Sequence, residues 1–217
     1  MTVLSEPALD AGLDTAAARR AMIDGQLRTS GVSDPRVLAA MAAVAREDYV
    51  PAARRAVAYC DRPVPLGEGR TLAPPVAHGQ MLAEAAPTRA DRALIVGGGS
   101  GYLAALLAPL VGTLHVVESG EFPGRRVGNW VAGPLGQGCK KGAPYSLILI
   151  DGAIEVLPDA LVRQLGDGGR VVTGLIERGV ARLAVGRKAA GAVGFLTLGE
   201  AEFALLPGFA KPRQWTF

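Results

Sequence analysis

The spacing of hydrophobic residues divides the chain into two parts. Up to about residue 90, apolar side chains recur every three or four positions, which predicts amphipathic helices. We expect these helices over residues 14–27, 34–44 and 75–86. Asp14 and Asp34 are suited to cap the first two helices, and Pro35 suits a first helical turn. Residues 51–75 are broken repeatedly by Pro and Gly, which predicts a loop-rich segment.

From residue 91 onward, the apolar residues form short continuous runs between glycine-rich turns. Such runs are typical of strands that are covered on both faces. We expect strands over residues 92–96, 113–117, 145–150 and 169–175, with helices over residues 101–108 and 158–165. Three more runs, 180–185, 194–198 and 202–206, follow at short spacing, as antiparallel strands would. This order predicts an α/β fold with a doubly wound, mostly parallel sheet and an antiparallel edge.

The composition is that of an ordinary globular protein, with 49% hydrophobic and 20% charged residues. A chain of 217 residues can bury one sizeable core. We therefore expect a single domain over residues 1–217, in which a helical and loop-rich segment of residues 14–90 packs on an α/β core of residues 91–217. The formal net charge of only +3 gives no reason to expect a nucleic-acid partner.

The sequence also bears on the compartment. Residues 1–14 are acidic and lack the apolar core of a signal peptide. The apolar stretch 103–117 contains Pro109 and Gly112 and is too short to span a bilayer. Cys60 and Cys139 lie far apart and match no metal or redox spacing. We expect a cytoplasmic monomer or homodimer that binds neither a membrane nor a metal.

A glycine-rich turn lies between a predicted strand and a predicted helix, in the segment Leu-Ile-Val-Gly-Gly-Gly-Ser-Gly-Tyr at residues 94–102. Gly97, Gly99 and Gly101 permit positive φ and let a ligand approach bare backbone. The helix that follows offers unpaired N–H groups at its start, close to Ser100. This context predicts a nucleotide-binding turn, and a tight turn without a ligand is the alternative.

Glu118 ends the next predicted strand, where a carboxylate can accept both hydroxyl groups of a ribose. The glycine spacing is G-x-G-x-G and not the G-x-G-x-x-G of dinucleotide sites, because Tyr102 is the third residue after Gly99. The pattern therefore favours S-adenosylmethionine as cofactor. A nicotinamide-dependent oxidoreductase, which would use the same carboxylate, is a weaker alternative.

The upstream half carries a long motif. It reads Q-L-R-T-S-G-V-S-D-P-R-V-L-A-A-M from Gln26, V-A-R-E-D-Y-V-P from Val44, A-Y-C-D-R-P-V-P-L-G from Ala58 and G-R-T-L-A-P-P from Gly69. These segments resemble the protein-L-isoaspartate O-methyltransferase family over residues 16–118, and the resemblance resumes over residues 143–172.

The resemblance implies a seven-stranded, Rossmann-like methyltransferase fold. Members of this family transfer a methyl group from S-adenosylmethionine to the carboxylate of an isoaspartyl residue in a damaged peptide or protein, which permits repair, and release S-adenosylhomocysteine. A carboxylate is already a nucleophile, so the reaction depends mainly on alignment and needs no catalytic base.

The resemblance also assigns candidate site residues. Ala73 stands at the position of the family's catalytic serine, and Thr71 is the neighbouring hydroxyl that can partly replace it. Pro75 and His78 follow and are expected at the substrate cleft. The residues expected to bind the cofactor are Gly97, Gly99, Ser100, Gly101, Glu118 and Asp151. For Asp151, which ends a predicted strand, a role as a turn or helix-capping residue is an equal alternative.

Two further departures from the family pattern weaken the expected cofactor site. Ile95 stands where the family has an acidic residue that orders the methionine end of the cofactor, and a hydrogen bond to a charged group contributes about 1.5–3 kcal/mol. Residues 119–144 are short and rich in Gly and Pro, which disfavours a regular helix, and Gly133-Pro134-Leu135 replaces the family's acidic residue at the adenine. The alternative to an active methyltransferase is a non-catalytic relative that binds a nucleoside or a protein partner.

Overall fold

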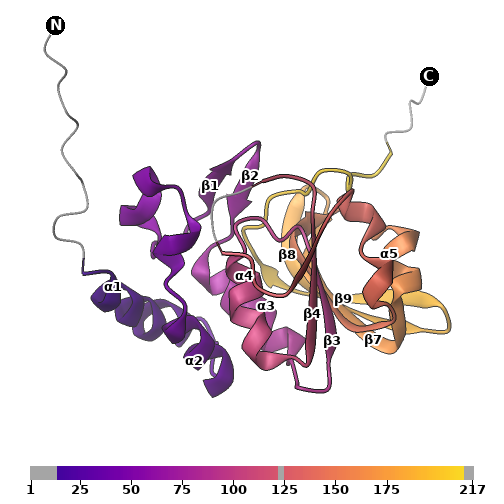
Figure 1. The fold of residues 1–217 in the computed structure, drawn as a ribbon, viewed down its shortest axis with the longest axis horizontal. Helices are drawn as coiled ribbons and strands as arrows, with labels where there is room; N and C mark the ends of the chain where they lie inside the picture. The colour runs from indigo at the N-terminus through magenta and orange to yellow at the C-terminus, as the bar shows by residue number, and fades with distance from the viewer. Residues whose placement is uncertain (1–13, 122–124, 213–217) are drawn as a thin grey trace, which may run out of the picture.

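A computed structural model describes residues 14–121 and 125–212, so the expectation for residues 1–13 lies outside the described part of the chain (Figure 1). Helix α1 (Thr15–Met22) begins after Asp14, whose side chain accepts a hydrogen bond from the N–H of Ala17, and a π-helical turn continues it over Ile23–Leu27. Helix α2 (Pro35–Ala43) begins after Asp34, which accepts from the N–H of Arg36. Both predicted caps are confirmed.

The predicted loop-rich segment contains a short hairpin that the hydrophobic pattern did not show. Its strands are β1 (Val64–Gly67) and β2 (Arg70–Leu72), which pair antiparallel. They follow two 3-10 turns, Arg46–Tyr49 and Ala52–Val57. These elements are too short to produce a periodic signal. Helix α3 (Pro75–Ala85) comes directly after the hairpin, as predicted.

The sheet has seven strands in the order β5-β4-β3-β6-β7-β8-β9. These are β3 (Arg92–Val96), β4 (Thr113–Glu118), β5 (Asn129–Ala132), β6 (Tyr145–Ile154), β7 (Leu165–Glu177), β8 (Val180–Ala189) and β9 (Ala192–Glu200). The first five strands in this order, from β5 through β4, β3 and β6 to β7, pair parallel with their neighbours. Strand β8 pairs antiparallel with β7, and β9 pairs antiparallel with β8. The predicted mostly parallel sheet with an antiparallel edge is confirmed.

One predicted strand is wrong, and a different segment supplies the seventh. Residues 202–206 form no strand; only Leu205 makes an isolated bridge, to Ala153. Phe203 and Leu206 are buried whereas the two residues between them are not, a spacing of three that no regular strand has. The segment crosses the end of β6 instead. Strand β5 comes from the short glycine-rich stretch, in which the described residues form no α-helix.

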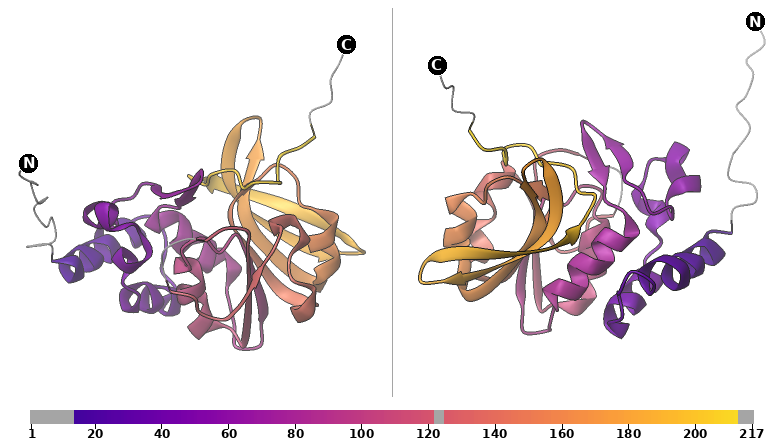
Figure 2. Two further views of the ribbon diagram at one scale, coloured as in Figure 1. Left: turned by 45° about the horizontal axis from the view of Figure 1, so that its top comes forward. Right: turned by 180° about the vertical axis from the view of Figure 1, so that it is seen from behind.

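Two hydrophobic clusters cover the two faces of the sheet. Helices α3 and α4 (Tyr102–Leu107, continued by the 3-10 turn Ala108–Leu110) pack on one face, and α5 (Asp159–Gln164) packs on the other. Helices α1 and α2, indigo in Figures 1 and 2, lie on the outside of α3 and α4, and α2 packs against both of these helices. Among the residues that the structure describes, no helix is long and apolar enough to cross a membrane.

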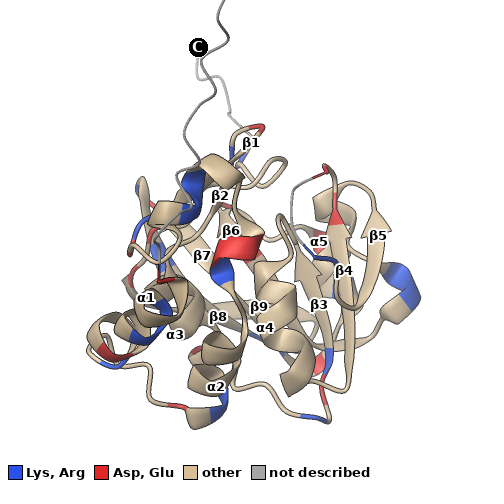
Figure 3. Cartoon of the chain, turned by 60° about the vertical axis from the view of Figure 1, so that its left-hand side comes forward, with Lys and Arg blue, Asp and Glu red and all other residues tan. Residues whose placement is uncertain are grey.

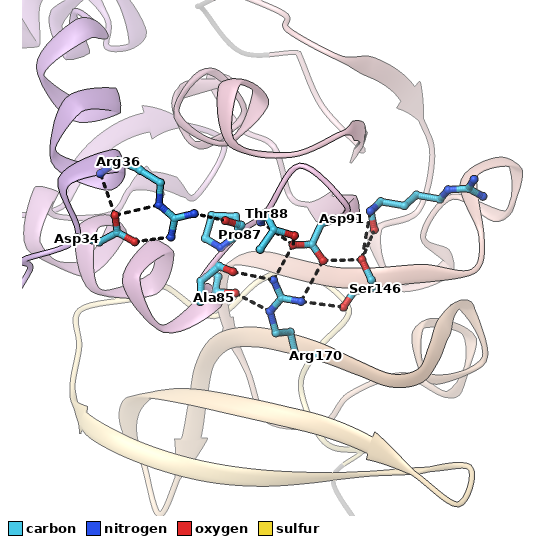
Figure 4. A network of polar contacts seen from close by, with 10 residues as sticks. Asp34, Arg36, Ala85, Pro87, Thr88, Asp91, Ser146 and Arg170 are labelled. Atoms are coloured by element: carbon cyan, nitrogen blue, oxygen red, sulfur yellow. Dashed lines mark hydrogen bonds and ion pairs between the residues drawn. The ribbon is translucent and has the colours of Figure 1, made fainter.

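A part-buried ion pair joins the strands at the end of the sheet where β3, β6 and β7 begin (Figure 4). The Arg170 guanidinium donates to both carboxylate oxygens of Asp91, at 3.1 and 2.8 Å, and to the Ala85 carbonyl at the end of α3. Ser146, on β6, donates to the same carboxylate. Acidic and basic residues are interspersed along the chain in Figure 3.

Candidate functional site

The candidate site lies where the order of the strands reverses. Strand β3 pairs with β4 on one side and β6 on the other, and Val96 is in register with Val117 and Ile150. The residues that follow these three, Gly97, Glu118 and Asp151, therefore emerge at the same edge of the sheet. In open α/β sheets this crevice, at the carboxyl ends of the strands, is where ligands bind.

The glycine turn has the backbone that the sequence predicted. Gly97, Gly99 and Gly101 have φ values of +79°, +50° and +88°. Gly101 also permits close packing, because a Cβ there would lie 2.3 Å from the carbonyl oxygen of Arg125. A Cβ on Gly97 or on Gly99 would instead lie 3.1 or 3.8 Å from the guanidinium of Arg70. The side of the turn formed by Gly97 and Gly99 thus faces the Arg70 side chain.

Arg70 is a site residue that sequence reasoning missed. Its Nη1 lies 3.0 Å from Oε1 of Glu118, and its Nη2 donates to the carbonyl oxygen of Gly97 at 3.1 Å. Both partners of this ion pair are buried. The other oxygen of Glu118 accepts from the N–H of Gly99 at 2.7 Å. Arg70 therefore pairs with the Glu118 carboxylate, which a bound ribose would use. A buried cation requires a paired anion, but nothing in the sequence indicates that Arg70 is buried.

A groove of about 670 Å³ extends from Glu118 along β4 and β5. Trp130, Val131 and Ala132 of β5 line one side of the groove, and Glu68 lies on the hairpin side. The groove is within the size range of small-molecule sites. Trp130 contributes an aromatic side chain to the lining, and the Arg126 guanidinium lies over its ring at 5.4 Å. Several residues of this groove belong to the segment 119–144, in which the sequence offered no residue for the adenine side of the site.

The hydroxyl of Ser100 is buried in the glycine turn and makes no hydrogen bond to any described residue. Ile95 is fully buried in β3, in register with Val116 and Leu149. Its side chain belongs to the core between the sheet and helices α3 and α4. No ligand-binding group therefore comes from position 95.

The two candidate catalytic positions lie together on the other side of the turn. Thr71 and Ala73 line a small cavity with Arg70 and Asp151, and the segment Phe203–Leu206 closes it. The cavity has a volume of about 10 Å³, the lower limit for a single water molecule. Leu206 is buried against the turn, since a Cβ on Gly97 would lie 3.0 Å from it. The reaction side of the site is thus closed in this structure.

His78 is fully buried and lies behind Asp151. Its Nε2 is 2.9 Å from Oδ1 of Asp151. Pro75 is the first residue of α3 and is also buried. His78 can therefore reach the predicted substrate cleft only through the Asp151 carboxylate.

Arg46, which the sequence did not single out, supports both His78 and Ala73. Its Nη2 donates to the carbonyl oxygen of Ala73, and its Nε donates to that of Ala58, both at 2.6 Å. The guanidinium stacks on the Tyr102 ring at 4.8 Å. Burial lowers the pKa of Arg46, and the charges of Tyr102 and Asp151 oppose that effect. A buried arginine thus fixes the backbone of the hairpin at the reaction side.

A family model described as protein-L-isoaspartate(D-aspartate) O-methyltransferase (PCMT) matches residues 17–122 and 130–206. A protein-L-isoaspartate O-methyltransferase of Koribacter versatilis is 36% identical over 201 residues, which cover 88% of this chain and 90% of the relative. A protein of the same name from Aeropyrum pernix is 42% identical over 171 residues, which cover 71% of this chain and 65% of the relative.

Solved structures agree with the fold. A Plasmodium falciparum protein assigned to the same family, in complex with S-adenosyl-L-homocysteine, aligns with a TM-score of 0.71 at 20% identity and covers 87% of this chain and 97% of its own. A second structure, a protein-L-isoaspartate O-methyltransferase, aligns with a TM-score of 0.72 at 21% identity and covers 88% of this chain and 66% of its own.

Proposed function

The chain belongs to the protein-L-isoaspartate O-methyltransferase family, and from this premise we propose that it methylates the carboxylate of isoaspartyl residues in proteins, with S-adenosylmethionine as methyl donor. The observation that carries the proposal is the meeting of three features at the strand reversal. These are the glycine turn, the Glu118 carboxylate and the hairpin positions Thr71 and Ala73.

The residues present fit an adenosyl group. Glu118 can accept the ribose hydroxyls, and the groove beside Trp130 has room for the base. The hydroxyl of Ser100 in the glycine turn has no partner among the described residues and is a further candidate polar contact. When bound, S-adenosylmethionine supplies a methyl group activated by its sulfonium and leaves as S-adenosylhomocysteine.

The protein's own contribution is alignment and exclusion of water. Thr71 on β2 and Ala73 directly after that strand lie beside the turn, so a substrate carboxylate held there lies next to the cofactor site. The segment Phe203–Leu206 covers this position and must move aside to admit a peptide. Action on proteins in the cytoplasm, as a monomer or homodimer consisting of one methyltransferase domain, stays a prediction.

The test is methyl transfer from radiolabelled S-adenosylmethionine to an isoaspartyl peptide, compared with the same peptide carrying ordinary aspartate. We expect labelling of the isoaspartyl peptide only, and its loss in Glu118→Gln. Glu177→Gln, at an exposed strand end, is the matched control. Cofactor binding without transfer would identify a non-catalytic relative. Absence of both binding and transfer would refute the proposal.

A further inference from the structure

Three buried ionisable side chains from separate parts of the chain form a connected row that ends at the site. Asp151 lies on β6, His78 on α3 and Arg46 in a 3-10 turn of the N-terminal segment. His78 and Arg46 have no exposed surface, and the Asp151 side chain is 9% exposed. Nδ1 of His78 lies 3.5 Å from Nη1 of Arg46, and Nε2 lies 2.9 Å from Asp151.

The position of Arg46 determines which ring nitrogen of His78 accepts a hydrogen bond and which one donates. A guanidinium only donates hydrogen bonds, so Nδ1 of His78 must be the acceptor and the ring proton is on Nε2. Nε2 then donates to Oδ1 of Asp151. Among the described residues, His78 is the only hydrogen-bond donor to this carboxylate. The second oxygen of Asp151 is therefore available to a ligand, and the first oxygen is held in place.

The available side of Asp151 faces the cavity that it shares with Arg70, Thr71 and Ala73. The Arg70 guanidinium, which lines this cavity, donates to the carbonyl oxygen of Gly97. The site thus already accommodates a cationic N–H donor at Gly97, with the Glu118 and Asp151 carboxylates on either side. The chemistry of this position is that of a site for a cation.

The direction of the groove indicates which cationic group of a ligand would lie at Asp151. The nucleoside groove lies over β4 and β5, on one side of the glycine turn, and Asp151 lies on β6, on the other side. A ligand whose ribose is on Glu118 and which crosses the turn therefore brings its far end to Asp151. In S-adenosylmethionine that end is a methionyl group with a charged amine. Position 95 supplies no carboxylate for this amine, because Ile95 is buried in the core.

We propose that Asp151, held in position by His78 and Arg46, binds the α-ammonium group of the cofactor's methionyl end beside the carbonyl oxygen of Gly97. This inference rests on the proposed function. Asp151 is then a binding residue, and His78 is a positioning residue that acts through it. The bound ammonium also neutralises a carboxylate that would otherwise repel the acidic substrate, so the cofactor should bind before the peptide.

Calorimetric titration with three ligands tests the assignment. S-adenosylmethionine and S-adenosylhomocysteine both carry the ammonium, whereas 5′-methylthioadenosine lacks the whole amino-acid part. We expect Asp151→Asn to weaken both ammonium ligands about 10- to 150-fold, the effect of losing a hydrogen bond to a charged group. The affinity for 5′-methylthioadenosine should not change. Glu118→Gln should weaken all three ligands.

Variants of His78 test its role separately. His78→Gln keeps an N–H that can donate to Asp151, so S-adenosylmethionine should bind within about threefold of the wild-type affinity. His78→Val removes the donor and should weaken binding of both ammonium ligands but not of 5′-methylthioadenosine. Because 5′-methylthioadenosine reports an intact nucleoside site, it also controls for misfolding in each variant.

Several outcomes would overturn the inference. Unchanged affinities in Asp151→Asn would show that this carboxylate does not contact the ligand, while the proposed function would stand if the wild type transfers methyl groups. Weakening of S-adenosylmethionine alone would place Asp151 at the sulfonium, and equal weakening of all three ligands would make its role structural. A wild-type protein that binds none of them would refute both the inference and the proposed function.

Discussion

At the residue scale, the Arg70 guanidinium binds the Glu118 carboxylate that the proposed function assigns to the ribose. The ion pair between Arg70 and Glu118 is buried, and Arg70 also donates to the Gly97 carbonyl. Sequence reasoning located Gly97, Glu118 and Asp151 because the carboxyl ends of adjacent parallel strands share one edge. It missed Arg70, Trp130 and Arg46 because residue order does not show which long side chain enters a cavity.

We expect Arg70→Gln to bind S-adenosylmethionine more tightly, by about tenfold, because a competing charged hydrogen bond is removed. The same variant should unfold at a lower temperature without ligand, since Glu118 loses its buried partner. Calorimetry and thermal melts with and without cofactor measure both effects. The exposed Arg62→Gln is the control. Weaker cofactor binding would mean that Arg70 contacts the ligand and does not compete with it.

Ala73 is the second informative residue, because its methyl group lines the closed cavity beside Thr71 and Asp151. Ala73→Ser restores a hydroxyl at that position and should raise kcat on an isoaspartyl peptide about three- to tenfold, the effect of one neutral hydrogen bond. Ala39→Ser, at an exposed position of α2, serves as control. An unchanged rate would show that position 73 does not face the acceptor carboxylate.

At the element scale, the segment Phe203–Leu206 shows the limit of pattern reading. Its apolar residues suggested a strand, but it crosses the end of β6, where the N–H of Ala153 donates to Ala204 and the Ala153 carbonyl accepts from Leu206. The hydrophobic pattern reports burial and not the partner of the buried face. The parallel strands β3, β4, β6 and β7 were predicted correctly because both of their faces are covered. The parallel strand β5 was not predicted, because it lies at the edge of the sheet and is largely exposed.

This arrangement predicts different roles for two adjacent leucines. Leu206 is 3% exposed and packs on the glycine turn, whereas Leu205 is 41% exposed. We expect Leu206→Ala to lower the free energy of unfolding by about 3 kcal/mol, as for other buried leucines. The matched Leu205→Ala should change it by less than about 0.5 kcal/mol. Urea denaturation measures both. Equal losses would contradict the crossing segment described here.

At the scale of the whole molecule, the two ends of the parallel strands differ in the contacts that join them. The end of the sheet where β3, β6 and β7 begin is joined by the part-buried Asp91–Arg170 pair, in which Arg170 also donates to the end of α3. The opposite end, where these strands finish, carries the site and is closed by the hairpin and the segment Phe203–Leu206. The alternation of strands and helices predicted this layered fold. It could not predict the pairing of Asp91 with Arg170, because the two residues are far apart in the chain.

The ion pair makes stability depend on pH in a defined direction. Burial alone would raise the pKa of Asp91, but hydrogen bonds from Arg170, Ser146 and Thr88 outweigh it and hold that pKa well below the usual 3.8. Because the pKa is lower in the folded protein, the stabilising contribution is present above about pH 4. It is lost as the pH falls below that value towards the folded pKa.

Asp91→Asn should therefore lower the free energy of unfolding by about 3 kcal/mol at pH 7, the cost of breaking a buried pair. The difference from the wild type should remain constant down to about pH 4 and shrink below it, because the wild type then takes up a proton at Asp91 on unfolding. Denaturant melts between pH 3 and pH 7 measure it, with the exposed Asp167→Asn as control. A difference that persists undiminished at pH 3 would assign the stabilisation to packing and not to the charge of Asp91.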